Sequence, residues 1–137
     1  DASVPREDMA MMLDAALVDA PCSGTGVMNE KPDVKYRVTE EGVQALCRTQ
    51  KDILDAIAPM VKVGGTLVYS TCSILPQENE EQIRAFLERH PEYEIQPMGA
   101  ELPEKLAAHE NALGLQMFAH RDGTDGFYVC RMRRVKA

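Results

Sequence analysis

The chain has 137 residues, 45% of them hydrophobic and 27% charged, with a formal net charge of -7. This length and composition fit one soluble globular domain with a real core, and they exclude a disordered segment. The acidic balance argues against a self-sufficient nucleic-acid-binding module, because a basic surface supplies most of the affinity for nucleic acid. Any contact with nucleic acid must therefore use local basic groups or a separate domain.

The first half of the chain predicts two buried β-strands with a helix between them. Residues 13–18 form an apolar strand, and a tight polar loop follows at residues 21–26. Thr39 and the two acids after it begin a helix, whose apolar residues recur with a period of about 3.6. The connection closes at the glycine pair 64–65, and residues 66–71 form the second strand.

A second helix and a terminal hairpin are expected in the second half. Pro76 suits the first turn of this helix, three glutamates follow closely, and a His-Pro pair ends it. Near the C-terminus, two strand-like runs at 115–119 and 127–132 flank a polar tip and predict an antiparallel hairpin. Residues 97–114 carry the weakest pattern, with a short helix expected around 103–109.

Strand, helix, strand, helix at this spacing implies parallel strands joined by right-handed crossovers. We therefore expect an α/β fold with parallel strands and a terminal antiparallel hairpin. The chain begins at Asp1 rather than Met and almost at once enters a buried-type strand, as a fragment would. Since no internal boundary is visible, residues 1–137 are expected to form a single partial domain.

The cysteine and histidine spacing argues against a metal centre. The four cysteines show no C-x-x-C pair and the three histidines are scattered, so zinc is not expected. Nothing indicates an exported disulfide scaffold, and no apolar run approaches the length of a membrane span. We therefore expect a cytoplasmic protein with reduced thiols, no metal and no membrane partner.

Cys22 and Cys72 each follow an apolar strand and enter a polar loop rich in small residues. In open α/β sheets, ligands bind beyond the carboxyl ends of the strands, so both thiols are candidates for one site. A thiolate is a strong nucleophile. Asp19, at the end of the first strand, would add a carboxylate that accepts hydrogen bonds or, once buried, holds a proton; a simple turn former is the alternative. Cys47 and Cys130 are instead expected in the core.

Four strings of the sequence resemble motifs of the Sun family of RNA cytosine-5 methyltransferases. These are Asp19-Ala20-Pro21-Cys22-Ser23-Gly24-Thr25-Gly26, the run from Lys62 that ends Ser70-Thr71-Cys72-Ser73, Glu78-Asn79-Glu80, and Asp125-Gly126-Phe127-Tyr128. The likeness runs essentially end to end, and within the family it is to bacterial enzymes that modify small-subunit ribosomal RNA. It implies a Rossmann-like sheet and S-adenosylmethionine-dependent methylation of carbon 5 of a cytosine in RNA.

The resemblance also implies roles for individual residues. Cys72 would be the nucleophile that adds to carbon 6 of cytosine, which makes carbon 5 electron-rich enough to take the methyl group. Cys22 would act in product release. Asp19, with Pro21 in the substrate site, would hold the base, and Asp1 and Asp19 would face the methyl donor. A base must be unstacked to reach such a pocket, which favours a single-stranded or loop target in RNA.

The sequence departs from the family in one respect. The glycine-rich loop and the acidic residue that mainly bind the donor are absent, and so is the upstream RNA-guiding domain. We therefore expect the C-terminal half of a catalytic domain, inactive alone, with the missing N-terminal part of the same protein as its partner. The missing strands would leave an open apolar edge, which a second copy could cover as a homo-oligomer.

Two other functional classes remain open from the residues alone. A cysteine-based redox or acyl-transfer enzyme could use the same two thiols, but it would need a cysteine–histidine arrangement, and no histidine lies near either motif. A non-catalytic binding module could keep the fold as an interaction surface. The intact pair of thiols argues against that class for the parent protein.

Overall fold

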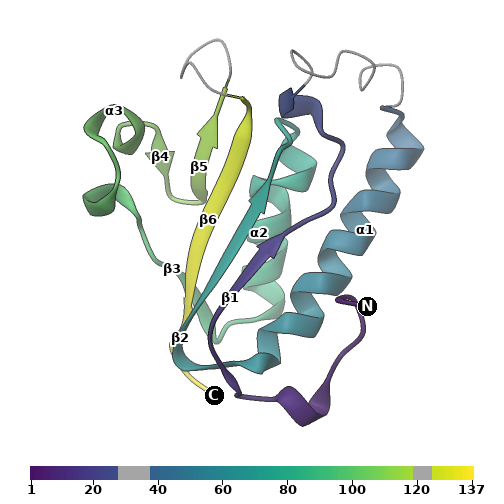
Figure 1. The fold of residues 1–137 in the computed structure, drawn as a ribbon, viewed down its shortest axis with the longest axis vertical. Helices are drawn as coiled ribbons and strands as arrows, with labels where there is room; N and C mark the ends of the chain where they lie inside the picture. The colour runs from purple at the N-terminus through teal and green to yellow at the C-terminus, as the bar shows by residue number, and fades with distance from the viewer. Residues whose placement is uncertain (28–37, 119–124) are drawn as a thin grey trace.

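The structure is a computed structural model that describes residues 1–27, 38–118 and 125–137. Its centre is a six-stranded sheet in the order β1-β2-β6-β5-β4, with β3 also paired to β6. Helices α1 and α2 lie side by side against one face of this sheet, and α2 is drawn behind the strands in Figure 1. The expected α/β fold is confirmed.

The elements have the following bounds. The strands are β1 (Leu13–Asp19), β2 (Val61–Thr71), β3 (Tyr93–Ile95), β4 (Glu110–Asn111), β5 (Gly114–Met117) and β6 (Phe127–Arg134). The α-helices are α1 (Glu40–Ile57), α2 (Glu80–Arg89) and α3 (Glu104–Ala107), and short helical turns include η5 (Pro76–Glu78). Both expected buried strands and the short helix near 103–109 are therefore present.

Helix α1 begins where the sequence predicts. The Oγ1 of Thr39 accepts a hydrogen bond of 3.0 Å from the backbone N–H of Gly42, which satisfies one of the free donors of the first turn. Helix α2 begins later than predicted. Pro76 starts the separate turn η5, and α2 itself starts at Glu80. The early turn removes Glu78 from the solvent-facing first turn of a helix and places it in the interior.

The strand directions follow the prediction. β1 and β2 are parallel, with Val18 beside Tyr69 and Asp19 beside Ser70. β5 and β6 are antiparallel, with Leu115 beside Val129, and residues 120–124 of the expected tip at 120–126 lie outside the described residues. β6 also pairs antiparallel with β2, so the hairpin extends the sheet beyond β2. β3 was not predicted, and it pairs with the second half of β6.

The core lies between the sheet and the two long helices. Its largest fully buried side chains include Leu54, Leu67, Tyr69, Ile83, Phe86, Tyr128 and Met132. Each such side chain contributes about 1.5–3 kcal/mol by leaving water. Cys130 is fully buried among them, as expected. None of the helices in the described part of the chain is both long and apolar enough to cross a membrane.

Candidate active site

The structure brings the two cysteines of the predicted site together. Cys22 lies in the loop after β1 and Cys72 directly follows β2, and their Sγ atoms are 3.2 Å apart. Parallel strands end at the same edge of a sheet, and the register of Asp19 beside Ser70 brings the two loops level. Both thiols are partly buried and neither is in a disulfide.

Glycines allow the loops to approach so closely. The backbone N–H of Gly26 donates to the carbonyl of Cys72 at 2.8 Å, and Gly126 N–H donates to the carbonyl of Gly26 at 2.7 Å. A Cβ on Gly26 would lie 2.0 Å from the carbonyl oxygen of Gly126, which no side chain tolerates. Gly24 has a φ of 73°, in the left-handed region. The glycines of this loop therefore serve a backbone crossing, and three of the sequence motifs meet there.

The surroundings of Cys22 hold the proton on its thiol. Burial, and to a smaller extent the hydrogen bond with Cys72, raise the pKa of Cys22 to about 12. Cys22 therefore keeps its proton at neutral pH and can donate it towards Cys72. A protonated thiol is the poorer nucleophile, because the thiolate is the reactive form.

A carboxylate that sequence reasoning missed joins the two cysteine loops. Glu78 is fully buried, and its carboxylate accepts hydrogen bonds from Ser23 N–H at 2.8 Å and Ser23 Oγ at 2.7 Å. It also accepts from Gln50 Nε2 at 3.1 Å and from the hydroxyl of Ser73. Ser23 and Ser73 are the residues that follow the two cysteines. The Glu78-Asn79-Glu80 string and the serine after each cysteine were the signals in the sequence that could have pointed to this acid.

Asn79 fixes the turn around Cys72 from both sides. Its Oδ1 accepts a hydrogen bond of 2.6 Å from Thr71 Oγ1, before the cysteine. Its Nδ2 donates to the carbonyl of Ser73 at 2.9 Å, after the cysteine, and to Gln116 Oε1 at 2.8 Å. The contacts of Glu78 and Asn79 thus give a structural reason for the Glu78-Asn79-Glu80 string, for which the sequence indicated no role beyond a family resemblance and a helix start.

Of the remaining predicted residues, Asp19 and Pro21 lie near the cysteine loops and Asp1 does not. Asp19 is exposed at the end of β1, where Ser70 Oγ donates to its Oδ1 at 3.4 Å. The carbonyl of Pro21 accepts from Gln50 Nε2 at 2.9 Å. Asp1 is not brought to this edge: its Oδ1 accepts from Ser3, and the N-terminus lies beside the middle of α1 in Figure 1.

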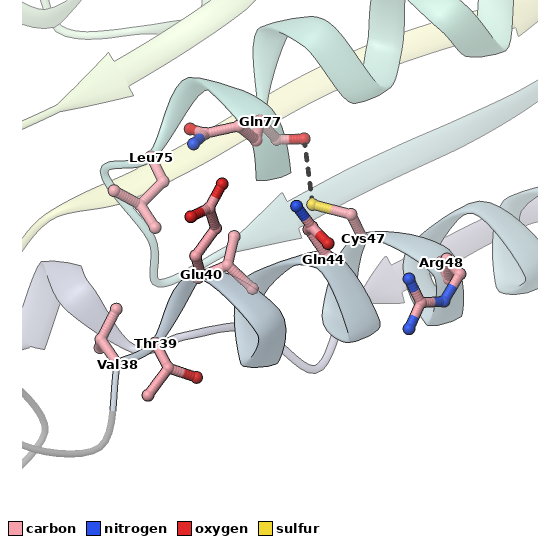
Figure 2. Close-up of a pocket in the computed structure, with 9 residues that line it drawn as sticks. Val38, Thr39, Glu40, Gln44, Cys47, Arg48, Leu75 and Gln77 are labelled. Atoms are coloured by element: carbon pink, nitrogen blue, oxygen red, sulfur yellow. Dashed lines mark hydrogen bonds between the residues drawn. The ribbon is translucent and has the colours of Figure 1, made fainter.

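A cavity of about 700 Å³ opens between the start of α1 and the turn before α2. Figure 2 shows its lining, which includes Gln44, Arg48 and Gln77. A smaller cavity of about 190 Å³ shares residues at the start of α1 with it and reaches Cys22. Cys47 is not a core residue as expected, because it is half-buried, lines the large cavity and donates to the carbonyl of Gln77 at 3.5 Å.

Asp1 and Asp19 do not converge on a concave site for a methyl donor within the described residues. The cavity that reaches Cys22 is lined by neither Asp1 nor Asp19, and both carboxylates are exposed. A carboxylate can accept hydrogen bonds from ribose hydroxyls or an amino group, but a donor site needs convergent groups in a concave surface. Within the described residues, no three histidine, cysteine, aspartate or glutamate side chains gather as ligands for a metal ion.

Comparison with known proteins identifies relatives over nearly the whole chain. Residues 1–133 match the family described as 16S rRNA methyltransferase RsmB/F. A protein of Bacillus subtilis (strain 168) described as probable ribosomal RNA small subunit methyltransferase B is 48% identical over 122 residues, which are 88% of this chain and 27% of that protein.

Solved structures share the fold. A structure described as PH0851 has a TM-score of 0.85 at 31% identity, over 97% of this chain and 29% of the other. A structure of NSun6 from Pyrococcus horikoshii with SFG has a TM-score of 0.72 at 25% identity, over 88% of this chain and 30% of the other. The chain therefore spans between a quarter and a third of these proteins.

Proposed function

Because the chain belongs to the 16S rRNA methyltransferase RsmB/F family, we propose that its parent protein methylates carbon 5 of a cytosine in ribosomal RNA. The observation that carries the proposal is the pair of thiols 3.2 Å apart at the carboxyl edge of the parallel strands. A cytosine flipped out of the RNA would meet both sulfur atoms there. Such a substrate places the protein in the cytoplasm, where thiols stay reduced.

Cys72 is the nucleophile in this proposal. Its thiolate forms a bond to carbon 6 of the base, and the electron pair of the 5,6 double bond moves towards carbon 5 and the ring. The charge that develops at ring nitrogen 3 is stabilised by a hydrogen bond that the carboxyl group of Asp19 donates in its protonated form, and Pro21 lies in the adjacent base-binding loop. Covalent addition divides one difficult step into easier ones, because an unactivated aromatic carbon does not attack a methyl group.

S-adenosylmethionine supplies the methyl group when bound, which the family and the neighbour solved with SFG support. Asp1 and Asp19 are the residues of this chain that we assign to the donor side. The rest of the donor site belongs to the missing N-terminal part of the protein, which makes residues 1–137 the C-terminal half of the catalytic domain. This chain alone is therefore expected to be inactive, and its net charge of -7 also leaves RNA binding to other parts.

Cys22 completes the reaction. The proton on carbon 5 leaves, the bond between Cys72 and carbon 6 breaks, and its electron pair returns to sulfur. In the free site the neighbouring thiol helps to raise the pKa of Cys22, through a hydrogen bond and through charge. Once Cys72 is bonded to carbon 6 these two contributions end. Cys22 then gives up its own proton to solvent more readily, and the resulting thiolate accepts the proton from carbon 5.

The test uses RNA with 5-fluorocytosine at the target position and the full-length protein. Fluorine cannot leave carbon 5 as a proton does, so the covalent adduct accumulates. Cys72→Ala is expected to form no adduct, whereas Cys22→Ala still forms one, seen as a slower band on a denaturing gel. An adduct with Cys72→Ala at the wild-type level would show that Cys72 is not the nucleophile.

A redox enzyme is the second candidate, since the same 3.2 Å separation favours disulfide formation. Acyl transfer lacks this support, because His90 lies at the far end of α2, held by Asp55 at 2.7 Å and Glu92 at 3.1 Å. Thiol titration before and after a mild oxidant measures the pair directly. Rapid disulfide turnover coupled to a second substrate, without RNA methylation, would favour the redox enzyme.

A further inference from the structure

Glu78 is a fully buried acid to which the proposed mechanism gives no task. Burying a carboxylate is unfavourable unless hydrogen bonds replace its lost hydration. Every partner that the structure gives it is a donor. Its Oε1 accepts from Ser23 N–H and Gln50 Nε2, and its Oε2 accepts from the hydroxyls of Ser23 and Ser73. The carboxylate therefore connects the residue after Cys22 with the residue after Cys72.

The acid is itself held from several sides. Tyr69 OH donates to the backbone carbonyl of Glu78 at 2.7 Å, which anchors η5 near the C-terminal end of β2. Gln50 belongs to α1, and its Oε1 accepts from Gln82 Nε2 of α2 at 3.2 Å. Glu78 thus lies where the two cysteine loops meet both long helices. A side chain fixed this way transmits the position of the scaffold to both loops.

We propose that Glu78 is the positioning residue that sets the separation of the two thiols, with Ser23 and Ser73 as its contacts. The inference rests on the proposed function, in which Cys72 and Cys22 act in turn on one nucleotide. Reacting groups must hold near-attack distances, and a misplacement of about 1 Å costs on the order of 100-fold in rate. Glu78 touches neither base nor donor in this assignment and acts only through the two serines.

The test begins with thiol-pair closure, which needs neither RNA nor methyl donor. In the full-length protein, one thiolate of the pair attacks oxidised glutathione and expels one glutathione thiolate. The other thiolate then attacks the mixed disulfide and expels the second, so the pair loses two electrons and two protons while glutathione disulfide is reduced. Mass spectrometry identifies the disulfide between Cys22 and Cys72 and gives the rate of the second, intramolecular step.

Glu78→Ala is expected to slow this step by about 10-fold or more, because it lowers the effective concentration of one thiol at the other. Glu78→Gln keeps the shape and one acceptor oxygen, and hydroxyls can turn to accept from its amide, so we expect a rate between the two. Glu81→Gln, an exposed acid one turn away in α2, is the matched control and should close at the wild-type rate. Wild-type closure in folded Glu78→Ala would overturn the proposal.

Two further measurements keep the test decisive. If Glu78→Ala fails to fold, the double variant Ser23→Ala with Ser73→Ala replaces it, since it removes the serine hydroxyls and leaves Gln50 in place. In RNA methylation, Glu78→Gln should lower kcat and leave KM for RNA unchanged, whereas a purely structural role would reduce only the amount of active protein. If disulfide closure is slow in Glu78→Ala but the wild-type protein does not methylate RNA, the positioning role stands and the proposed function is rejected. If closure in Glu78→Ala is as fast as in the wild type and the wild-type protein forms the RNA adduct, the proposed function stands and the positioning role is rejected.

Discussion

Two regions of the sheet differ in which groups they bury: the carboxyl edge of β1 and β2 buries polar side chains, and the region along β1 exposes apolar ones. At the carboxyl edge of β1 and β2, polar side chains are fully buried and hydrogen-bonded, as Glu78, Asn79 and Ser73 show. Along the outer side of β1, apolar side chains are exposed instead: Leu17 is 70% exposed and Met12 62%. Buried polar groups need partners, and exposed apolar groups need cover.

This difference separates the thiol site, whose buried polar groups find their partners within this chain, from the edge of β1, which has no partner strand within the described residues. The carboxyl edge draws every partner of Glu78 from residues of this chain, so the thiols are organised without the rest of the protein. β1 pairs only with β2 within the described residues, and its other edge is free. In the proposed parent protein we expect another part of the protein to cover β1, and we expect the isolated chain to cover it with a second copy.

Gly26→Ala should have the largest effect, because Gly26 makes the closest backbone contact between the loops at the carboxyl edge. The new Cβ would lie 2.0 Å from Gly126 O and 2.8 Å from Cys72 O, both backbone atoms that cannot turn away. We expect a loss of about 3 kcal/mol in the free energy of unfolding, measured with denaturant. Gly99→Ala is the control, since its nearest atom, Glu110 Oε1, is 3.3 Å away at the end of a side chain. Equal stability of both variants would mean that the two loops are not in close contact.

Leu17→Lys tests the exposed edge of β1. In the isolated chain the substitution adds a charge to an exposed position, so we expect a change in unfolding free energy within about 0.5 kcal/mol and less self-association by size-exclusion chromatography. In the full-length protein the same lysine would be buried, at a cost on the order of 2 kcal/mol. The small effect in both proteins would show that nothing covers β1.

The same contrast explains what the sequence could predict. Apolar periodicity and the Thr39 cap predicted β1, β2 and α1, because burial and capping are local patterns. The meeting of Cys22 and Cys72 followed from parallel strands ending at one edge. Fifty positions separate these two cysteines in the sequence, and the parallel arrangement of β1 and β2 brings them together.

Burial of polar residues was not predictable in this way. An acid at position 78 is typical of the first turn of a helix, and only the separate turn η5 directs the side chain of Glu78 into the interior. Cys47 falls on an apolar helical stripe, yet the turn before α2 leaves a cavity beside it. In both cases the outcome depends on where α2 begins, which is set by tertiary contacts that local propensity does not contain.

The smallest expected effect concerns the proton on Cys22. Burial and the neighbouring Cys72 together raise the pKa of its thiol to about 12, so its alkylation by iodoacetamide should stay slow near pH 8 and rise only as the pH approaches about 12. Cys72→Ala removes the neighbour that contributes to this rise, and the alkylation profile of Cys22 should move to lower pH. Since burial is the larger cause and remains, the pKa should still lie above 9.0, the ordinary value. Mass spectrometry of the Cys22 peptide across pH, with the Cys47 peptide as internal reference, measures both profiles. An unchanged profile in Cys72→Ala would mean that the two thiols do not interact, although Glu78 and the Gly26 backbone would still join their loops.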